Sequence, residues 1–187
     1  RTHSSMVSPI TIRTPAAIMA YESRVHLVQG IFLFRSDPVC MLLYSLAHWV
    51  SLRDPVFLDY ALLLVGNMMF SLSYFGIGAQ YLWSDWPRVN MLIAPMGIMI
   101  SVAAGTRFIR ATLAVYNASR SIDLILRVAG ATAALGLIGT VSGLIDYRMA
   151  QTLVTVLGIL VTVIVLPVAA FYTRRGLSDA AYILFGW

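Results

Sequence analysis

Five long apolar segments limit what this chain can fold into more than any other feature does. A transmembrane helix needs about 20 mostly apolar residues, and each of the five segments is long enough. Of the 187 residues, 59% are hydrophobic and only 11% are charged, against about 45–50% and about 25% in a soluble domain. The sequence predicts an all-α, polytopic transmembrane helix bundle and leaves no room for a soluble catalytic domain. We expect five complete spans plus the start of a sixth, at about 26–50, 56–78, 90–109, 122–145, 150–172 and 179–187 (incomplete).

The two ends of the chain differ from this apolar pattern. Residues 1–25 are polar and contain Pro9 and Pro15, so we interpret them as the end of an exported sensory domain or as a linker, with the bundle at 26–187. The chain starts at Arg1 without the pattern of a signal peptide. It stops at Trp187 inside an apolar run that is too short to cross a bilayer. We therefore expect the sequence to be a piece of a longer protein.

Arginines predict how the bundle is oriented. The 13 basic residues are spread through the chain, giving a net charge of +5. This distribution is typical of membrane topology signals and argues against nucleic-acid binding. Alternate loops are rich in arginine (Arg53, Arg107, Arg110, Arg120, Arg174 and Arg175), and the intervening loops hold only Arg88 and Arg148. The positive-inside rule then places the first set in the cytoplasm and the N-terminus outside. Counting the tail weakens this prediction, because the tail also carries arginines (Arg1, Arg13 and Arg24).

Charged residues inside the first apolar segment are candidates for a functional site. Arg35 and Asp37 lie two residues apart, so on a helix they point to different faces and cannot pair. Asp37 precedes Pro38, and this order is typical of a helix start. We predict a kink or break at residues 35–38, with the polar groups facing neighbouring helices or a wet cavity. We favour a purely structural kink, and a ligand or ion site at the break is the alternative.

Other polar residues within the spans have a simpler interpretation. Asn67 lies in the middle of the second span, where it could hydrogen-bond another helix, and packing is favoured over ligand binding. Asp59 and Arg127 each lie about one turn into a span, where the long side chain of Arg127 can reach the membrane surface. Asp123 stands four residues before Arg127, the favourable order for an ion pair on a helix. For the pair of Asp123 and Arg127 we favour a local structural role over a functional one.

Small residues predict close helix packing in the fourth span. Gly139 and Gly143 form a GxxxG match, which lets helix backbones approach closely. The contact can be within the chain, and a homodimer through this pair is a hypothesis. The single cysteine, Cys40, rules out an internal disulfide, and we interpret it as a buried packing residue. We see no catalytic set, no metal ligands at a suitable spacing and no cofactor motif.

Several short motifs resemble one known family, the bacterial seven-transmembrane receptors with diverse intracellular signalling modules. The first motifs are Tyr44-Ser45, then Ser51-Leu52-Arg53-Asp54 and Tyr60. Three later stretches agree in order and spacing: 78–83 (GAQYLW), 108–110 (FIR), and 174–176 (RRG) leading to 180–187 (AAYILFGW). The resemblance covers about residues 20–187. Ser45 stands where the family usually has Asn, and residues 35–38 interrupt a first span that is normally more apolar.

The resemblance also implies a domain organisation and a topology for the parent protein. Members of the family have an exported N-terminal sensory domain, seven helices in the bacterial inner membrane, a periplasmic N-terminus, and a cytoplasmic output module such as a diguanylate cyclase or a histidine kinase. Trp187 would then lie within the sixth span, with the seventh span and the output module beyond it in the same parent chain. No ligand residues of the family transfer to this sequence.

These observations favour a non-catalytic transmembrane sensor or transducer segment of a signalling receptor. Its expected partners are the lipid bilayer, the output module of the same parent chain and, as a hypothesis, a second copy of itself. A transporter or permease subunit is the alternative, because polar groups at broken helices can line a path. The sequence shows few central charges and no internal repeat, which weakens that alternative. A membrane-embedded enzyme has the least support.

Overall fold

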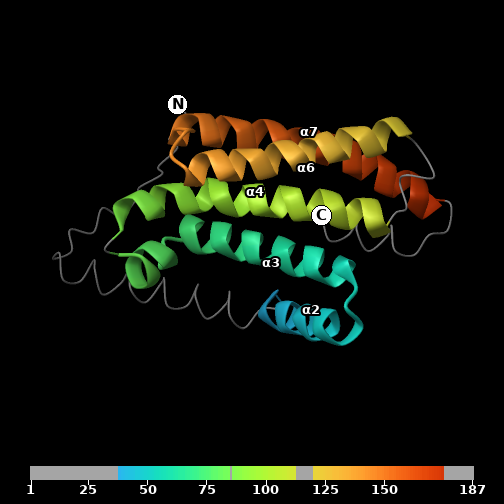
Figure 1. Cartoon of the computed structure of the whole chain (residues 1–187), viewed down its shortest axis with the longest axis horizontal. Coiled ribbons are helices and arrows are strands. Elements are labelled where there is room, and N and C mark those ends of the chain that lie inside the picture. Colours follow the sequence, from blue (N-terminus) through green and yellow to red (C-terminus); the bar gives the residue numbers. More distant parts are fainter. Residues whose placement is uncertain (1–37, 85, 113–119, 175–187) are drawn as a thin grey trace, which may run out of the picture.

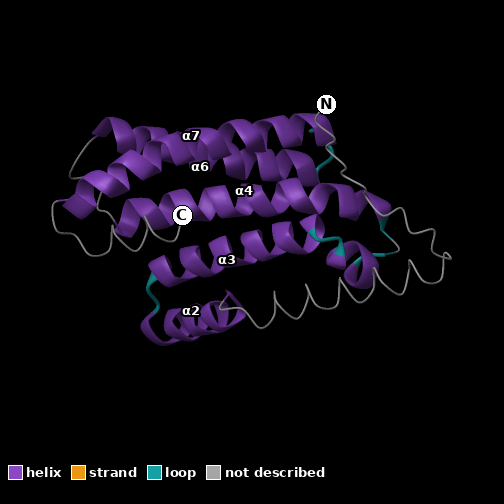
Figure 2. Cartoon of the chain, turned by 180° about the vertical axis from the view of Figure 1, so that it is seen from behind, coloured by secondary structure: helices purple, strands orange, loops and turns teal. Residues whose placement is uncertain are grey.

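A computed structural model describes residues 38–84, 86–112 and 120–174, and these residues form helices joined by short turns, with no strand among them. Four long helices, α3, α4, α6 and α7, lie side by side, with α4 between α3 and α6 (Figures 1 and 2). The helix α2 packs against α3. The elements are α2 (Pro38–Leu52), α3 (Pro55–Tyr74), the short π-helix η1 (Gly78–Leu82), α4 (Pro87–Thr112), α6 (Arg120–Val141) and α7 (Tyr147–Arg174).

Four of these helices are long and apolar enough to cross a membrane: Pro55–Tyr74, Val89–Thr112, Arg120–Val141 and Tyr147–Arg174. They correspond to the second to fifth expected spans, so the helical class of the fold is confirmed. The helix α2 overlaps the first expected span. Its 15 residues extend only about 22 Å at 1.5 Å per residue, less than the ~30 Å of the hydrocarbon core. Residues 26–37 and the sixth segment lie outside the described residues.

The turn between α2 and α3 shows why the second span starts where the sequence predicts. The backbone N–H of Val56 donates to Asp54 Oδ1 at 3.0 Å, and Pro55 is the first helical residue. An N-cap aspartate followed by proline favours a helix start, because the proline removes an N–H that would have no partner there. Just before it, Arg53 has a φ of 53°, a left-handed backbone conformation. Its N–H donates to Trp49 O at 2.8 Å and closes the last turn of α2.

Two glycines let α3 and α4 cross with their backbones in contact. A Cβ on Gly66 would overlap the carbonyl oxygen of Gly97, and a Cβ on Gly97 would lie 2.7 Å from the carbonyl oxygen of Gly66. On α4, Gly97, Ser101 and Gly105 follow one another at four-residue spacing, so they share one helix face. A Cβ on Gly105 would lie 2.9 Å from a side-chain carbon of Leu63 on α3. This face is a small-residue packing surface of the kind that holds membrane helices together.

The apolar core lies between α4, α6 and α7. One cluster of fully buried side chains joins all three helices (Ile109, Leu126, Ala129, Ala133, Leu157, Val161 and Val165). A second cluster near the other end contains Met99, Ala150 and Val154. Alanine and valine predominate, which allows the helices to pack closely along their length.

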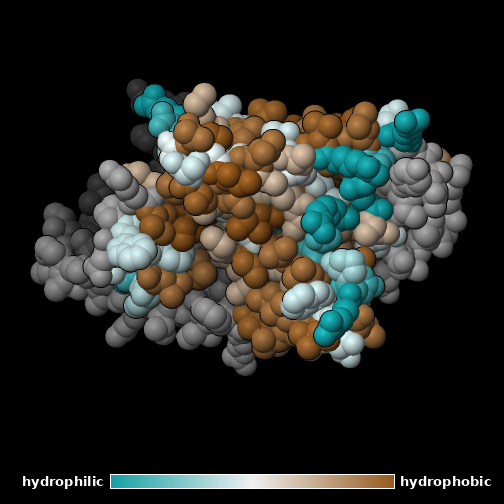
Figure 3. All heavy atoms as spheres, in the orientation of Figure 1, coloured by the Kyte–Doolittle hydropathy of each residue, from teal (hydrophilic) through white to brown (hydrophobic). Residues whose placement is uncertain are grey.

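The outer surface of the helices is also apolar. Figure 3 shows hydrophobic residues over most of one face, and hydrophilic residues gathered in a band that crosses the helices near one end. Large side chains such as Leu135 and Val163 are about two-thirds exposed, at 69% and 64%. Such a surface fits a protein whose solvent is lipid.

The structure corrects the interpretation of Cys40, which is exposed rather than buried. On α2 only Ser45 is fully buried. The other side of this helix faces away from the bundle, and the cysteine lies there among exposed apolar residues such as Met41 and Leu43. An apolar pattern around a cysteine predicts burial in a soluble protein. In a membrane helix it fits the lipid-facing side equally well.

Candidate functional site

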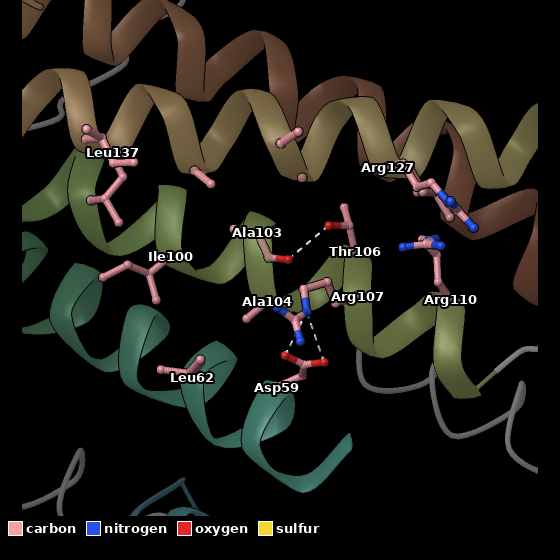
Figure 4. Close-up of a pocket in the computed structure, with 15 residues that line it drawn as sticks. Asp59, Leu62, Ile100, Ala103, Ala104, Thr106, Arg107, Arg110, Arg127 and Leu137 are labelled. Atoms are coloured by element: carbon pink, nitrogen blue, oxygen red, sulfur yellow. Dashed lines mark hydrogen bonds and ion pairs between the residues drawn. The ribbon is translucent and has the colours of Figure 1, made fainter. Parts of the chain in front are cut away.

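Five charged side chains gather where α3 and α6 begin and α4 ends, and we call them the ion-pair cluster. They come from three helices: Asp59 on α3, Arg107 and Arg110 on α4, and Asp123 and Arg127 on α6. Most of these side chains border the groove drawn in Figure 4. Charges inside a membrane segment are costly and need partners, and in this cluster every carboxylate has an arginine partner.

The first pair joins α3 to α4. Arg107 Nε lies 3.1 Å from Asp59 Oδ1 and donates to Asp59 Oδ2 at 3.3 Å. The side chain of Asp59 is only 7% exposed, whereas that of Arg107 is 64% exposed. The aliphatic stem of an arginine can lie along apolar surface while its charged group reaches water. The exposed Arg107 thus neutralises the charge of the buried Asp59 carboxylate. This is in keeping with the structural role expected for Asp59.

The second set joins α4 to α6. Asp123 accepts from Arg110 Nε at 2.6 Å across the two helices and lies 2.8 Å from Arg127 Nε on its own helix. The pairing of Asp123 with Arg127, four residues apart, confirms the sequence prediction. The partner on α4 was not predicted, because the third span was expected to end at residue 109, which would put Arg110 in a loop. The helix in fact continues to Thr112.

A groove of about 650 Å³ adjoins the cluster and lies between α3, α4 and α6. Arg107, Arg110 and Arg127 border one end of it, and apolar side chains such as Ile100 and Leu137 line the rest (Figure 4). The carboxylate of Asp59 lies at the same end, so the groove is charged at one end and mostly apolar over the rest. Among the described residues, no three His, Cys, Asp or Glu side chains are grouped so that they could hold a metal ion.

Of the intramembrane candidates from the sequence, Asn67 is described, and it lies apart from this cluster. Ser101 Oγ on α4 donates to Asn67 Oδ1 on α3 at 3.4 Å and to Leu63 O at 3.2 Å, so Asn67 makes the expected hydrogen bond between helices. Arg35 and Asp37, together with the predicted break, lie outside the described residues. The helix α2 begins at Pro38.

The structure also corrects how the glycine pair in α6 is used. Gly139 is buried, and a Cβ there would lie 2.6 Å from Ile145 Cδ1, in the turn that follows α6. Gly143 lies beyond the end of the helix with a φ of 76°, and the N–H of Leu144 donates back to Gly139 O at 2.9 Å. This is the geometry of a helix end closed by a left-handed glycine. The two glycines therefore do not share one helix face, and the close crossing is made by Gly66 and Gly97 instead.

Comparison with known proteins agrees with the geometry. Residues 38–187 match the model of a family described as 7TM diverse intracellular signalling, and this span includes every helix of the described structure. Neither the comparison with curated proteins nor that with solved structures gives a match. The family consists of non-catalytic, membrane-spanning sensor regions of signalling receptors, so α3, α4, α6 and α7 are helices of a multi-pass membrane protein. The chain therefore belongs to the 7TM diverse intracellular signalling family.

Proposed function

We propose that this chain is the transmembrane transducer of a bacterial receptor. In this proposal it relays an external signal to a cytoplasmic output module, of the diguanylate cyclase or histidine kinase type, that follows it in the parent chain. Residues 1–25 would be the end of the exported sensory domain, and the N-terminus would lie in the periplasm of an inner-membrane protein. The single observation that carries the proposal is the family match over residues 38–187.

The ion-pair cluster suggests how the relay works. Arg107 and Arg110 lie three residues apart on α4, yet they pair with carboxylates on different helices, Asp59 on α3 and Asp123 on α6. A shift of α4 along its axis would change both pairs at once. A signal can only bias an equilibrium between packings that already exist. Ion pairs that break and re-form across sliding helices are one known means of building two such packings.

The position of the cluster suits an output on the cytoplasmic side. It lies at the end of the bundle where α2 ends, α3 begins, α4 ends and α6 begins. The positive-inside rule supports a cytoplasmic location for this arginine-rich end. A change of pairing would therefore occur next to the proposed output module.

A test uses the parent protein in membrane vesicles, with output activity as the measurement. We expect Asp59→Asn to change the basal output, because Arg107 loses its carboxylate and α4 is no longer tied to α3. The double variant Asp59→Arg with Arg107→Asp should move the output back towards the original level, since it restores an ion pair. Arg148→Gln, which removes an exposed arginine at the opposite end of the bundle, is the matched control and should leave the output unchanged.

Two results would contradict the proposal. One is a parent gene that encodes no output module after this region, which would favour the transporter alternative. The other is an output that responds equally to Asp59→Asn and to the control variant. Equal responses would show that the cluster has no specific part in the relay.

A further inference from the structure

The groove beside the ion-pair cluster is charged at one end and apolar over the rest of its length. The arginine end is bordered by Arg107, Arg110 and Arg127 together with Asp59, the partner of Arg107. Apart from Thr106, the remaining lining is apolar. A small inorganic anion would contact only the arginines and leave the apolar part unfilled. A ligand that matches the whole groove needs an anionic group joined to an apolar chain.

The dimensions of the groove fit one leaflet of a bilayer. On α6 its lining runs from Leu126 to Ile138, a distance of about 18 Å at 1.5 Å per residue. Half of a hydrocarbon core of ~30 Å is ~15 Å. A lipid whose headgroup lies at the arginines would therefore place its acyl chain beside this lining as far as the bilayer midplane.

The groove opens on the lipid-facing surface, and small residues of α6 form one of its sides. Leu62 and Ile138, which line it, are 41% and 65% exposed. The part of α6 that lines the groove includes three small residues, Gly130, Ala131 and Ala134. Small side chains on a helix leave space that an acyl chain can fill. Larger residues at these positions would close the groove.

The charges at the arginine end favour an anion. Three arginines face two carboxylates, so the ion-pair cluster has an excess of one positive charge. The closest contact of each arginine with a carboxylate is through Nε, and a guanidinium has four more N–H groups in a fork that suits phosphate. The side chains of Arg107 and Arg127 are 64% and 53% exposed, so these groups can reach a headgroup.

We propose that this groove binds an anionic glycerophospholipid from the adjacent leaflet, with its phosphate on the three arginines and one acyl chain along the small-residue wall of α6. Basic pockets between membrane helices are suited to acidic headgroups. The proposal requires only that the helices span a membrane, and it holds or fails independently of the proposed relay.

Native mass spectrometry of the full 187-residue chain, released from detergent, tests the proposal. The probes are phosphatidylglycerol and phosphatidylcholine with identical acyl chains. We expect one phosphatidylglycerol to bind more tightly than phosphatidylcholine. Arg127→Gln should weaken phosphatidylglycerol binding about fivefold, the effect of removing one charge near an acidic headgroup. Ala134→Leu, which fills the groove and leaves every arginine in place, should weaken the binding of both lipids.

Matched controls separate the groove from general effects. Arg148→Gln removes an exposed arginine at the other end of the bundle, and Ala47→Leu adds the same bulk to an exposed position on α2. Both should leave lipid binding unchanged. If Arg127→Gln fails to fold because Asp123 loses a partner, Ala134→Leu still tests the groove.

Three outcomes would overturn the proposal. The first is equal binding of the two lipids. The second is displacement of phosphatidylglycerol by millimolar inorganic phosphate, which would show that the site binds the free anion. The third is an Ala134→Leu variant that is destabilised in lipid-free detergent while its lipid binding is unchanged, which would show that another part of the protein fills the groove.

Discussion

The glycine crossing between α3 and α4 gives a prediction whose size can be worked from the structure. In Gly66→Ala the new Cβ would overlap the carbonyl oxygen of Gly97 and would lie 2.8 Å from the backbone nitrogen of Ser101. Both atoms belong to the backbone, so α4 as a whole must move away. Overpacking of this kind costs about 1–3 kcal/mol, and the loss of a hydrogen bond between the helices, from Ser101 to Leu63, adds about 0.6 kcal/mol.

A second glycine supplies the matched control. A Cβ on Gly158, within α7, would meet no atom within 4 Å, so Gly158→Ala adds the same methyl group without a clash. Both variants gain about 1 kcal/mol of helix propensity, so their difference isolates the packing cost. We expect the free energy of unfolding of Gly66→Ala to be lower than that of Gly158→Ala by about 2–4 kcal/mol.

The assay is reversible unfolding in mixed micelles by titration with sodium dodecyl sulfate, followed by circular dichroism. Each variant is compared with the unchanged chain and with the other variant. Equal unfolding free energies for Gly66→Ala and Gly158→Ala would refute the reasoning, because they would show that α3 and α4 do not cross with their backbones in contact.

Three further predictions follow from other parts of the structure. Asp123→Asn should lower the free energy of unfolding more than Arg127→Gln does, because it takes the carboxylate from two arginines; the same titration measures both, and the reverse order would contradict the shared pairing. Gly143→Ala should cost about 1 kcal/mol, because its φ of 76° is left-handed; an unchanged stability would argue against that turn. Reporter fusions should place residue 86 outside and residue 120 in the cytoplasm; an external signal at residue 120 would reverse the proposed orientation.

The long helices could be predicted from the sequence because length and apolar composition alone decide whether a segment can span a bilayer. The start of α3 was also predictable, since Asp54 and Pro55 form a local signal that needs no knowledge of the rest of the chain. The pair of Asp123 and Arg127 is local for the same reason, because four-residue spacing on a helix brings two side chains together.

The parts of the site that could not be predicted depend on how the helices meet. The contact of Arg110 with Asp123 requires α4 to continue past its apolar stretch and α6 to lie beside it. No short sequence pattern predicts either of these two features. Gly66 and Gly97 are on different helices, so no spacing rule links them. Gly139 and Gly143 match the sequence of a packing motif, but the motif does not predict where the helix ends. Because the helix ends at Val141, Gly143 caps it instead of packing against another helix.

The left-handed conformation of Arg53 sets a backbone strain against a favourable charge interaction in one short loop. A glycine at this position would relieve a backbone strain of about 1–2 kcal/mol, yet the chain has an arginine there. If the loop lies in the cytoplasm, as proposed, that charge is attracted to the acidic lipids of the inner leaflet by about 1 kcal/mol. The attraction offsets much of the strain only while the protein is in its membrane. In neutral detergent the offset disappears, so the turn between α2 and α3 should be less stable after extraction than in the cell.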